Sequence, residues 1–203
     1  MRKTGSLISL SGFDGVGKST QVKLLLQYLE KKGKRVKVTQ AMFGYFLLKP
    51  LIKVLRSTTG SLSEGPVKRN NRLLPKFWFI LAFVDIWLGY IFKIIPSRGK
   101  YDVVIADRFY TDIWANLLYY GYLPDWAFNI FTKLLPKPDI AFMLKAKSEI
   151  VLRREKEFPS SYYKEQEKIY DRLSNKVNFY IVDANQLPKI VFGEIKEKIK
   201  DYL

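Results

Sequence analysis

The sequence predicts an α/β fold of three layers, in which a five-stranded parallel sheet carries helices on both faces. Short apolar runs alternate with segments of helical periodicity along the 203 residues, a pattern typical of a parallel sheet. The first apolar run leads directly into a glycine-rich loop at 12–19. Because no linker of different composition interrupts the chain, we expect a single domain over 1–203.

The individual elements follow from these runs. Strands are expected at Ser6–Ser11, Arg35–Gln40, Val103–Asp107, Asp139–Leu144 and Phe179–Val182. Helices are expected from Lys18 to Gly33 and at Tyr45–Ser57, Leu74–Ile95, Asp112–Tyr120, Trp126–Leu135, Ser148–Glu157, Tyr163–Lys176 and Leu187–Tyr202. Glycine, proline and hydroxyl residues make Ser57–Asn71 a predicted surface loop.

Residues 12–19, Gly-Phe-Asp-Gly-Val-Gly-Lys-Ser, match the phosphate-binding loop (P-loop) pattern G-x-x-x-x-G-K-[ST] between a strand and a helix. Its glycines let backbone N–H groups face one anion, and the positive end of the next helix points there too. Lys18 can reach the β- and γ-phosphates, and the Ser19 hydroxyl can ligate Mg²⁺. The sequence therefore predicts the P-loop NTPase fold and ATP binding. The expected nucleotide-binding residues are Gly12, Phe13, Asp14, Gly15, Val16, Gly17, Lys18, Ser19 and Thr20.

The composition narrows the classes of reaction that this protein can catalyse. The chain has no cysteine and no histidine, so it lacks thiolate metal ligands, the usual general base and the commonest ligand of transition metals. Phosphoryl transfer needs neither residue, because it depends on positioning and on charge stabilisation by Mg²⁺, Lys and Arg. These absences favour a kinase.

A second motif is the apolar strand Val103–Asp107, which ends in a carboxylate followed by Arg108. A parallel strand would bring Asp107 to the edge of the sheet beside the P-loop, where it can direct Mg²⁺. Arg108 would bind a phosphate with two parallel hydrogen bonds.

Together these residues resemble the thymidylate kinase family of P-loop nucleoside monophosphate kinases. The resemblance is carried by Gly12 to Thr20 and Asp107-Arg108-Phe109, supported by Ala115, Pro138-Asp139, Leu152-Arg153-Arg154 and Val182-Asp183-Ala184-Asn185 in the family's order and spacing. It spans essentially the whole chain and implies transfer of the ATP γ-phosphate to dTMP, giving dTDP, with Mg²⁺ as cofactor.

The resemblance also implies roles for single residues. Asp14 would contact the 3′-hydroxyl of the acceptor sugar, Arg108 the acceptor phosphate, and Asp107 with Ser19 the Mg²⁺ ion. A short basic lid around 153–162, carrying Arg153, Arg154 and Lys156, would close over the transferring group. The implied catalytic residues are Lys18, Arg108, Arg153 and Arg154, and the implied substrate-binding residues are Asp14, Phe83 and Arg108.

The chain departs from the family where the acceptor is recognised. Gln40–Gly44 replaces the family's R-E-P-G-G, and Ala82–Ile86 keeps the acid of F-x-x-D-R but moves the phenylalanine by one and replaces the arginine. Asn116 stands at the position of an aromatic residue beside the sugar. Two alternatives therefore stay open: a kinase for another (deoxy)nucleoside monophosphate, and a P-loop NTPase that binds nucleic acid through its basic surface.

The net charge is +16, with positive residues spread along helices, as at Lys31–Arg35 and Lys196–Lys200. This distribution is typical of a solvated basic surface, so we expect small nucleotide substrates, no stable nucleic-acid partner and a cytoplasmic location. Abundant lysine and isoleucine without cysteine suit a thermophile.

The segment Phe77–Ile95 is apolar over a length that could span a membrane, but Asp85 lies near its centre. We therefore expect a helix packed in the core or against a second copy of the chain, which predicts a homodimer and no membrane. A membrane-associated ATPase is the remaining alternative for this segment.

Overall fold

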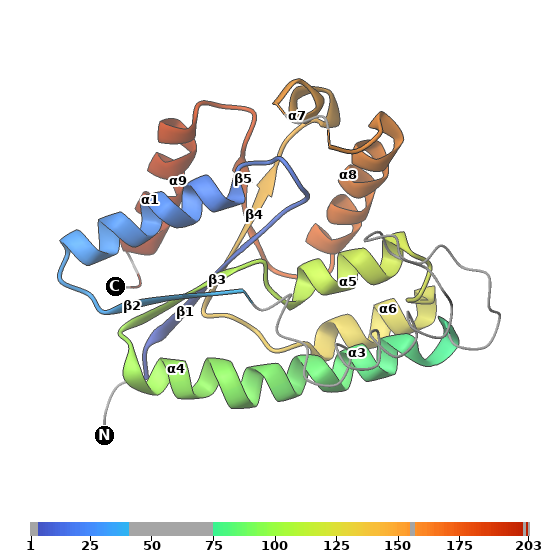
Figure 1. Ribbon diagram of the computed structural model, residues 1–203, viewed down its shortest axis with the longest axis horizontal. Coiled ribbons are helices and arrows are strands. Elements are labelled where there is room, and N and C mark those ends of the chain that lie inside the picture. The colour runs from blue at the N-terminus through green and yellow to red at the C-terminus, as the bar shows by residue number, and fades with distance from the viewer. Residues whose placement is uncertain (1–3, 41–74, 155–156, 201, 203) are drawn as a thin grey trace.

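The computed structural model describes residues 4–40, 75–154, 157–200 and 202. The predicted helix Tyr45–Ser57 and the predicted loop Ser57–Asn71 lie outside these residues. In the described part of the chain, five parallel strands form one sheet in the order β2-β3-β1-β4-β5 (Figure 1). The predicted five-stranded parallel sheet is confirmed.

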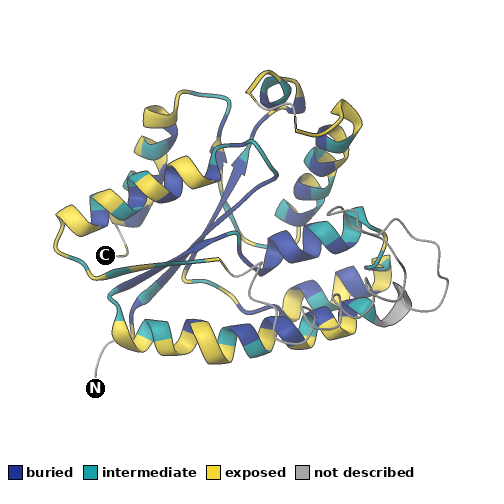
Figure 2. Ribbon diagram, viewed as in Figure 1, coloured by how far each residue is buried: buried dark blue, intermediate teal, exposed yellow. Residues whose placement is uncertain are grey.

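The strands lie close to their predicted positions: β1 Ser6–Ser11, β2 Val36–Thr39, β3 Val103–Asp107, β4 Ile140–Lys145 and β5 Tyr180–Asp183. Strand β2 begins after the predicted Arg35 because the Arg35 N–H donates to the carboxylate of Asp102, 2.8 Å away. The residues of β1, β3 and β4 are almost all buried, which explains why these strands are continuous apolar runs in the sequence (Figure 2).

Helices cover both faces of the sheet, as predicted (Figure 1). Helices α1 and α9 pack together on one face, and α4, α5 and α8 lie on the other. The helices are α1 Lys18–Lys31, α3 Pro75–Gly89, α4 Ile95–Lys100, α5 Tyr110–Tyr119, α6 Asp125–Phe131, α7 Ser148–Arg154, α8 Ser160–Ser174 and α9 Pro188–Lys200. Two short helices of other types are η1, a π-helical turn at Tyr90–Ile94, and η2, a 3₁₀ turn at Thr132–Leu134.

The long apolar helix continues past its predicted end at Ile95. Helix α3 passes through the π-helical turn η1 into α4, which ends at Lys100 although Pro96 lies in its first turn. Proline lacks an N–H donor and crowds the preceding turn, and the wider hydrogen bonding of a π-turn accommodates such a break. The predicted helix Leu74–Ile95 therefore ends five residues too early.

Two other helices begin before their predicted starts. Helix α5 begins at Tyr110, so Asp112 is its third residue. The Asp112 side chain accepts a hydrogen bond from the Phe109 N–H and thereby caps the start of the helix. Helix α8 begins at Ser160, directly after Pro159. The predicted helix Trp126–Leu135 is divided into α6 and η2.

The continuous helix Trp78–Lys100 is long and apolar enough to cross a membrane by length and composition, and an 18-residue window within it has a mean hydropathy of 1.9. One of its faces packs into the core through Phe79, Ala82 and Ile86 (Figure 2). An exposed stripe runs along the helix and consists of Ile80, Val84, Trp87, Ile91 and Ile95, flanked by Leu81 and Phe92. We call these seven residues the α3 stripe. The helix is therefore a core element on one side and an apolar surface on the other.

Candidate phosphate-binding site

The P-loop connects the end of β1 to the start of α1, as the motif predicts. Gly12, Gly15 and Gly17 all have positive φ angles, of 149°, 81° and 96°. At Gly12 the constraint is also steric, because a Cβ atom would lie 2.7 Å from the carbonyl oxygen of Leu144. Only glycine suits this turn, and it lets the loop backbone lie against β4.

Two side chains of the loop anchor it to the core. Phe13 and Val16 are buried, and the Phe13 ring lies against Tyr170 with ring centroids 6.2 Å apart. Their predicted contacts with a nucleotide would therefore come from the backbone. Ser19 and Thr20 lie on the exposed first turn of α1.

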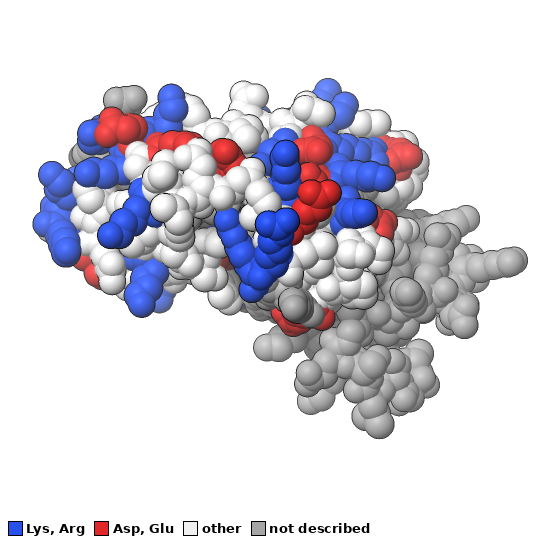
Figure 3. Space-filling model, turned by 90° about the horizontal axis from the view of Figure 1, so that it is seen from above, with Lys and Arg blue, Asp and Glu red and all other residues white. Residues whose placement is uncertain are grey.

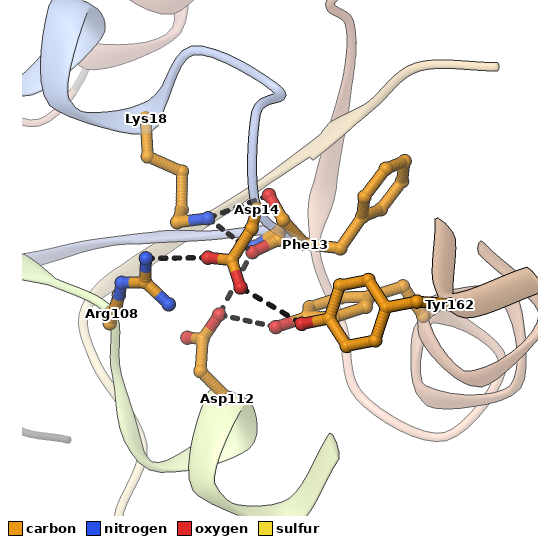
Figure 4. A network of polar contacts seen from close by, with 8 residues as sticks. Phe13, Asp14, Lys18, Arg108, Asp112 and Tyr162 are labelled. Atoms are coloured by element: carbon orange, nitrogen blue, oxygen red, sulfur yellow. Dashed lines mark hydrogen bonds and ion pairs between the residues drawn. The ribbon is translucent and has the colours of Figure 1, made fainter. Parts of the chain in front are cut away.

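Lys18 is buried and lies over the loop (Figure 4). Its Nζ donates hydrogen bonds to the carbonyl oxygens of Gly12, at 2.6 Å, and Phe13, at 2.7 Å. Burial, together with the nearby charge of Arg108, lowers the pKa of Lys18 to about 8. Burial therefore destabilises the charged form of Lys18, and an anion bound beside it would stabilise that form.

Arg108 and Asp14 form an ion pair between the strand end of β3 and the P-loop. Strands β1 and β3 are adjacent and in register, with Leu10 beside Asp107, so Arg108 follows directly at the same edge. Its Nη2 donates to Oδ1 of Asp14 at 2.6 Å, and the Tyr162 hydroxyl donates to Oδ2 at 2.9 Å (Figure 4). Although burial alone would raise it, the pKa of Asp14 is lowered by the charges of Lys18 and Arg108. Asp14 is therefore an ionised carboxylate that orients Arg108.

The backbone at Arg108 is strained. Arg108 has a φ of 63°, in the left-handed region that residues with a Cβ rarely occupy, and its N–H donates to the carbonyl oxygen of Leu10 at 3.1 Å. Such strain is concentrated at functional sites, where the surrounding structure holds it in place. Here it directs the guanidinium toward the P-loop.

Asp107 is the predicted Mg²⁺ ligand at the end of β3. It is buried, and its Oδ1 has no hydrogen-bond partner among the residues that the structure describes. The same residues contain no cluster of three or more acidic side chains that could hold a metal. The carboxylate oxygen without a partner fits Mg²⁺, which is commonly bound by one or two protein ligands while phosphate oxygens and water supply the others. Asp107 and the Ser19 hydroxyl would be those protein ligands.

Asp112 is a site residue that the sequence analysis did not identify. Its buried carboxylate accepts four hydrogen bonds: from the Gly12 N–H at 3.2 Å, Ser11 Oγ at 2.8 Å, the Phe109 N–H at 2.8 Å and the Tyr170 hydroxyl at 2.7 Å. Burial raises the pKa of Asp112, although the charge of Lys18 opposes this effect. The carboxylate joins the first glycine of the P-loop to α5 and α8.

Helix α8 supplies two further residues that the sequence analysis missed. The Tyr162 hydroxyl donates a hydrogen bond to Asp14 (Figure 4). The Tyr170 hydroxyl donates one to Asp112. No motif identifies these tyrosines. The only sequence signal for Asp112 is its place three residues after Phe109, where an acidic side chain can cap a helix.

The predicted lid residues lie at the end of α7. Arg153 is exposed, whereas Arg154 donates to the carbonyl oxygens of Ala184, at 3.0 Å, and Asn185, at 3.1 Å. Arg154 thus lies against the connection between β5 and α9. Lys156 is outside the described residues.

Phe83, predicted to contact the acceptor, lies in an aromatic cluster on α3. Its ring centroid is 4.9 Å from that of Phe131 and 6.3 Å from that of Trp114. Of the other positions that depart from the family pattern, Asp85 is buried and Asn116 is half-buried on α5, whereas 41–44 lie outside the described residues.

The doubly covered parallel sheet, the P-loop after β1 and the Asp-Arg pair after β3 define a P-loop protein of the nucleotide kinase type. The chain is 30% identical over 191 residues to a protein of Saccharolobus solfataricus named probable thymidylate kinase 1, covering 89% of each chain. The chain belongs to the thymidylate kinase family.

Other comparisons agree with this assignment. The chain is 28% identical over 156 residues to thymidylate kinase of Rickettsia typhi, covering 74% of this chain and 69% of the relative. The crystal structure of thymidylate kinase from Ehrlichia chaffeensis matches 97% of this chain and 100% of its own, with a TM-score of 0.60. At 21% identity that likeness concerns the fold alone. No protein-family model matches the chain.

Proposed function

We propose that this protein transfers the γ-phosphoryl group of ATP to a nucleoside monophosphate, with dTMP as the preferred acceptor. The main support is one arrangement: the buried Lys18 on the P-loop lies beside the ion pair of Arg108 and Asp14. The P-loop suits the donor phosphates, and a partly exposed arginine held at the neighbouring strand end suits the acceptor phosphate. The names of the relatives support dTMP.

In this proposal each charged group has one task. Lys18 exchanges its bonds to the loop carbonyls for donor phosphate oxygens, and Arg108 holds the acceptor phosphate in line with the donor. Asp14 contacts the acceptor sugar while it orients Arg108. Mg²⁺, held by Asp107 and Ser19, would neutralise charge on the β- and γ-phosphates.

No general base is required, which agrees with the absence of histidine. In phosphoryl transfer the transition state is largely dissociative, and charge on the transferred group matters more than removal of a proton. Arg153 and Arg154 would approach that charge when the lid closes.

We place the protein in the cytoplasm as a homodimer that associates through the α3 stripe, without a stable nucleic-acid partner. On the face that carries the phosphate-binding end of the molecule, basic side chains alternate with acidic and uncharged ones (Figure 3). That pattern favours small anionic substrates over a continuous track for a polyanion.

The test is ADP formation from ATP and Mg²⁺ across a panel of ribo- and deoxyribonucleoside monophosphates. We expect the highest kcat/KM with dTMP and no more than a trace of ATP hydrolysis without an acceptor. Lys18→Ala should abolish transfer, whereas Lys23→Ala, on the exposed side of α1, should leave it unchanged. Hydrolysis of ATP without a diphosphate product from any acceptor would refute the proposal. Preference for another monophosphate would refute only the choice of dTMP.

A further inference from the structure

A cavity lies away from the P-loop. Its volume is about 640 Å³, within the range of small-molecule sites. Its walls come mainly from the segments 132–139 and 176–180, which lead into β4 and β5. These segments lie at the amino ends of parallel strands, at the end of the sheet opposite the P-loop (Figure 1). We call this space the basal cavity.

The inner wall of the basal cavity contains two hydroxyl groups without partners. Ser9 Oγ, on β1, and Thr132 Oγ1, at the start of η2, are both buried and make no hydrogen bond within the described part of the chain. Buried polar groups are nearly always satisfied in native proteins. Both oxygens are enclosed by surrounding protein atoms, so an occupant of the cavity would reach them only if the lining side chains shifted.

The rim of the cavity is basic. Lys133, Lys137 and Lys176 line it, all three are exposed, and none forms an ion pair among the described residues. The carboxylate at the rim, Asp139, is neutralised by Arg98 at 2.8 Å and also accepts the Leu7 N–H at 2.7 Å. The charge at the mouth is positive, so it selects an anion.

The remaining walls mix apolar and polar side chains. The apolar part includes Phe109, Leu135, Val177 and Phe179, and the polar part includes Thr111, Asn178, Tyr180 and Tyr202. We propose that the basal cavity is a second ligand site, which binds a small organic anion with an aromatic or aliphatic body. The lysines hold its charged group at the rim, and the apolar side chains contact its body. This site is independent of the proposed kinase activity.

The probe for this site is 8-anilinonaphthalene-1-sulfonate, an aromatic organic anion whose fluorescence rises in apolar surroundings. The full chain is titrated with the probe in saturating Mg²⁺ and ADP, which occupy the P-loop. We expect saturable binding of one probe per chain. The triple variant Lys133→Glu, Lys137→Glu, Lys176→Glu should weaken this binding at least tenfold.

Two matched variants separate the site from general effects. Lys31→Glu, Lys32→Glu, Lys189→Glu changes the net charge equally at exposed positions on α1 and α9, and should alter probe affinity less than twofold. Val177→Trp, at a half-buried position of the rim, should block probe binding while the circular dichroism spectrum stays native.

If both charge variants weakened probe binding equally, the proposal would be overturned. Unchanged probe binding in Val177→Trp would overturn it as well. Loss of the fluorescence in Ile91→Ser, Phe92→Ser would assign the probe to the α3 stripe instead and would equally overturn it.

Discussion

The buried position of Lys18 on the P-loop implies a measurable pH dependence. Because its pKa in the free protein is lowered to about 8, Lys18 is charged below this pH and becomes neutral above it. A neutral lysine attracts donor phosphates less, whereas bound ATP favours the charged form.

We therefore predict that kcat/KM for ATP falls about tenfold per pH unit above about pH 8, because this parameter reports ionisations of the free enzyme. The kcat, measured with ATP bound, should stay level to higher pH. A steady-state pH profile measures both. Lys18→Arg, which does not titrate in this range, serves as the control and should lack the decline. A wild-type profile that is level to pH 10 would contradict the prediction.

Substitution of Asp112 tests whether nucleotide binding by the P-loop depends on a residue outside the P-loop motif. Asparagine has nearly the same shape, but its amide nitrogen would face N–H and O–H donors that now share a carboxylate. We predict that Asp112→Asn lowers the free energy of unfolding by about 2–3 kcal/mol, as measured by urea unfolding. We also predict more than tenfold weaker binding of Mg²⁺ and ADP under conditions where the variant stays folded.

Tyr170→Phe is the companion variant for Asp112. It removes one of the four donors and leaves the Gly12 N–H bonded, so nucleotide affinity should change less than threefold while stability falls by about 1 kcal/mol. Wild-type nucleotide affinity in folded Asp112→Asn would show that this carboxylate only stabilises the fold.

At the level of elements, the strands and the P-loop were predictable for a physical reason. A strand buried on both faces must be apolar throughout, and the P-loop is a contiguous motif, so both can be read from neighbouring residues. The network around the loop cannot be read in this way. Tyr162 and Asp14 are 148 positions apart, and Tyr170 and Asp112 are 58 apart. Such contacts depend on how α8 packs beside α5, which local sequence does not encode.

Helix α7 is the element that should close the site. Arg153 is exposed, and Arg154 is bound to backbone carbonyls of the connection between β5 and α9. A closing lid stabilises charge mainly in the transition state, so its loss should appear in kcat. We predict that Arg153→Ala with Arg154→Ala lowers kcat at least tenfold and raises KM for ATP less than threefold in steady-state assays.

The control for the lid removes the same amount of charge nearby. Lys164 and Lys168 are exposed on α8, and their double alanine variant should keep near wild-type kcat. A double arginine variant that loses ATP affinity and retains kcat would mean that these arginines bind the donor in its ground state.

At the scale of the whole molecule, the exposed α3 stripe bears on how many copies of the chain associate. Its five central residues recur at intervals of three or four positions, the spacing that lets one helix pack along another. The continuous helix carries these residues across the bottom of the molecule in Figure 1, away from the P-loop.

We predict a homodimer that Ile91→Glu with Phe92→Glu converts to a monomer, because the dimer would bury two new charges in each copy. Sedimentation velocity at micromolar concentration measures this change. Ile130→Glu with Leu134→Glu, at exposed apolar positions outside the stripe, should leave the dimer intact. A monomeric wild-type chain, or dissociation in both variants, would exclude association through the stripe.

The order of the strands has a consequence for the way the chain folds. Strand β1 pairs only with strands that come much later in the sequence, with Ser6 beside Val103 and Ile8 beside Ile140. During synthesis the first strand therefore has no sheet partner until the chain has grown past β3. The Gly12 N–H likewise has no bond to the Asp112 carboxylate until that residue has been synthesised. Contacts between distant residues slow folding and leave early segments exposed. The phosphate-binding loop, although it is encoded near the beginning, therefore cannot make its bond to Asp112 until the chain has been synthesised past its middle.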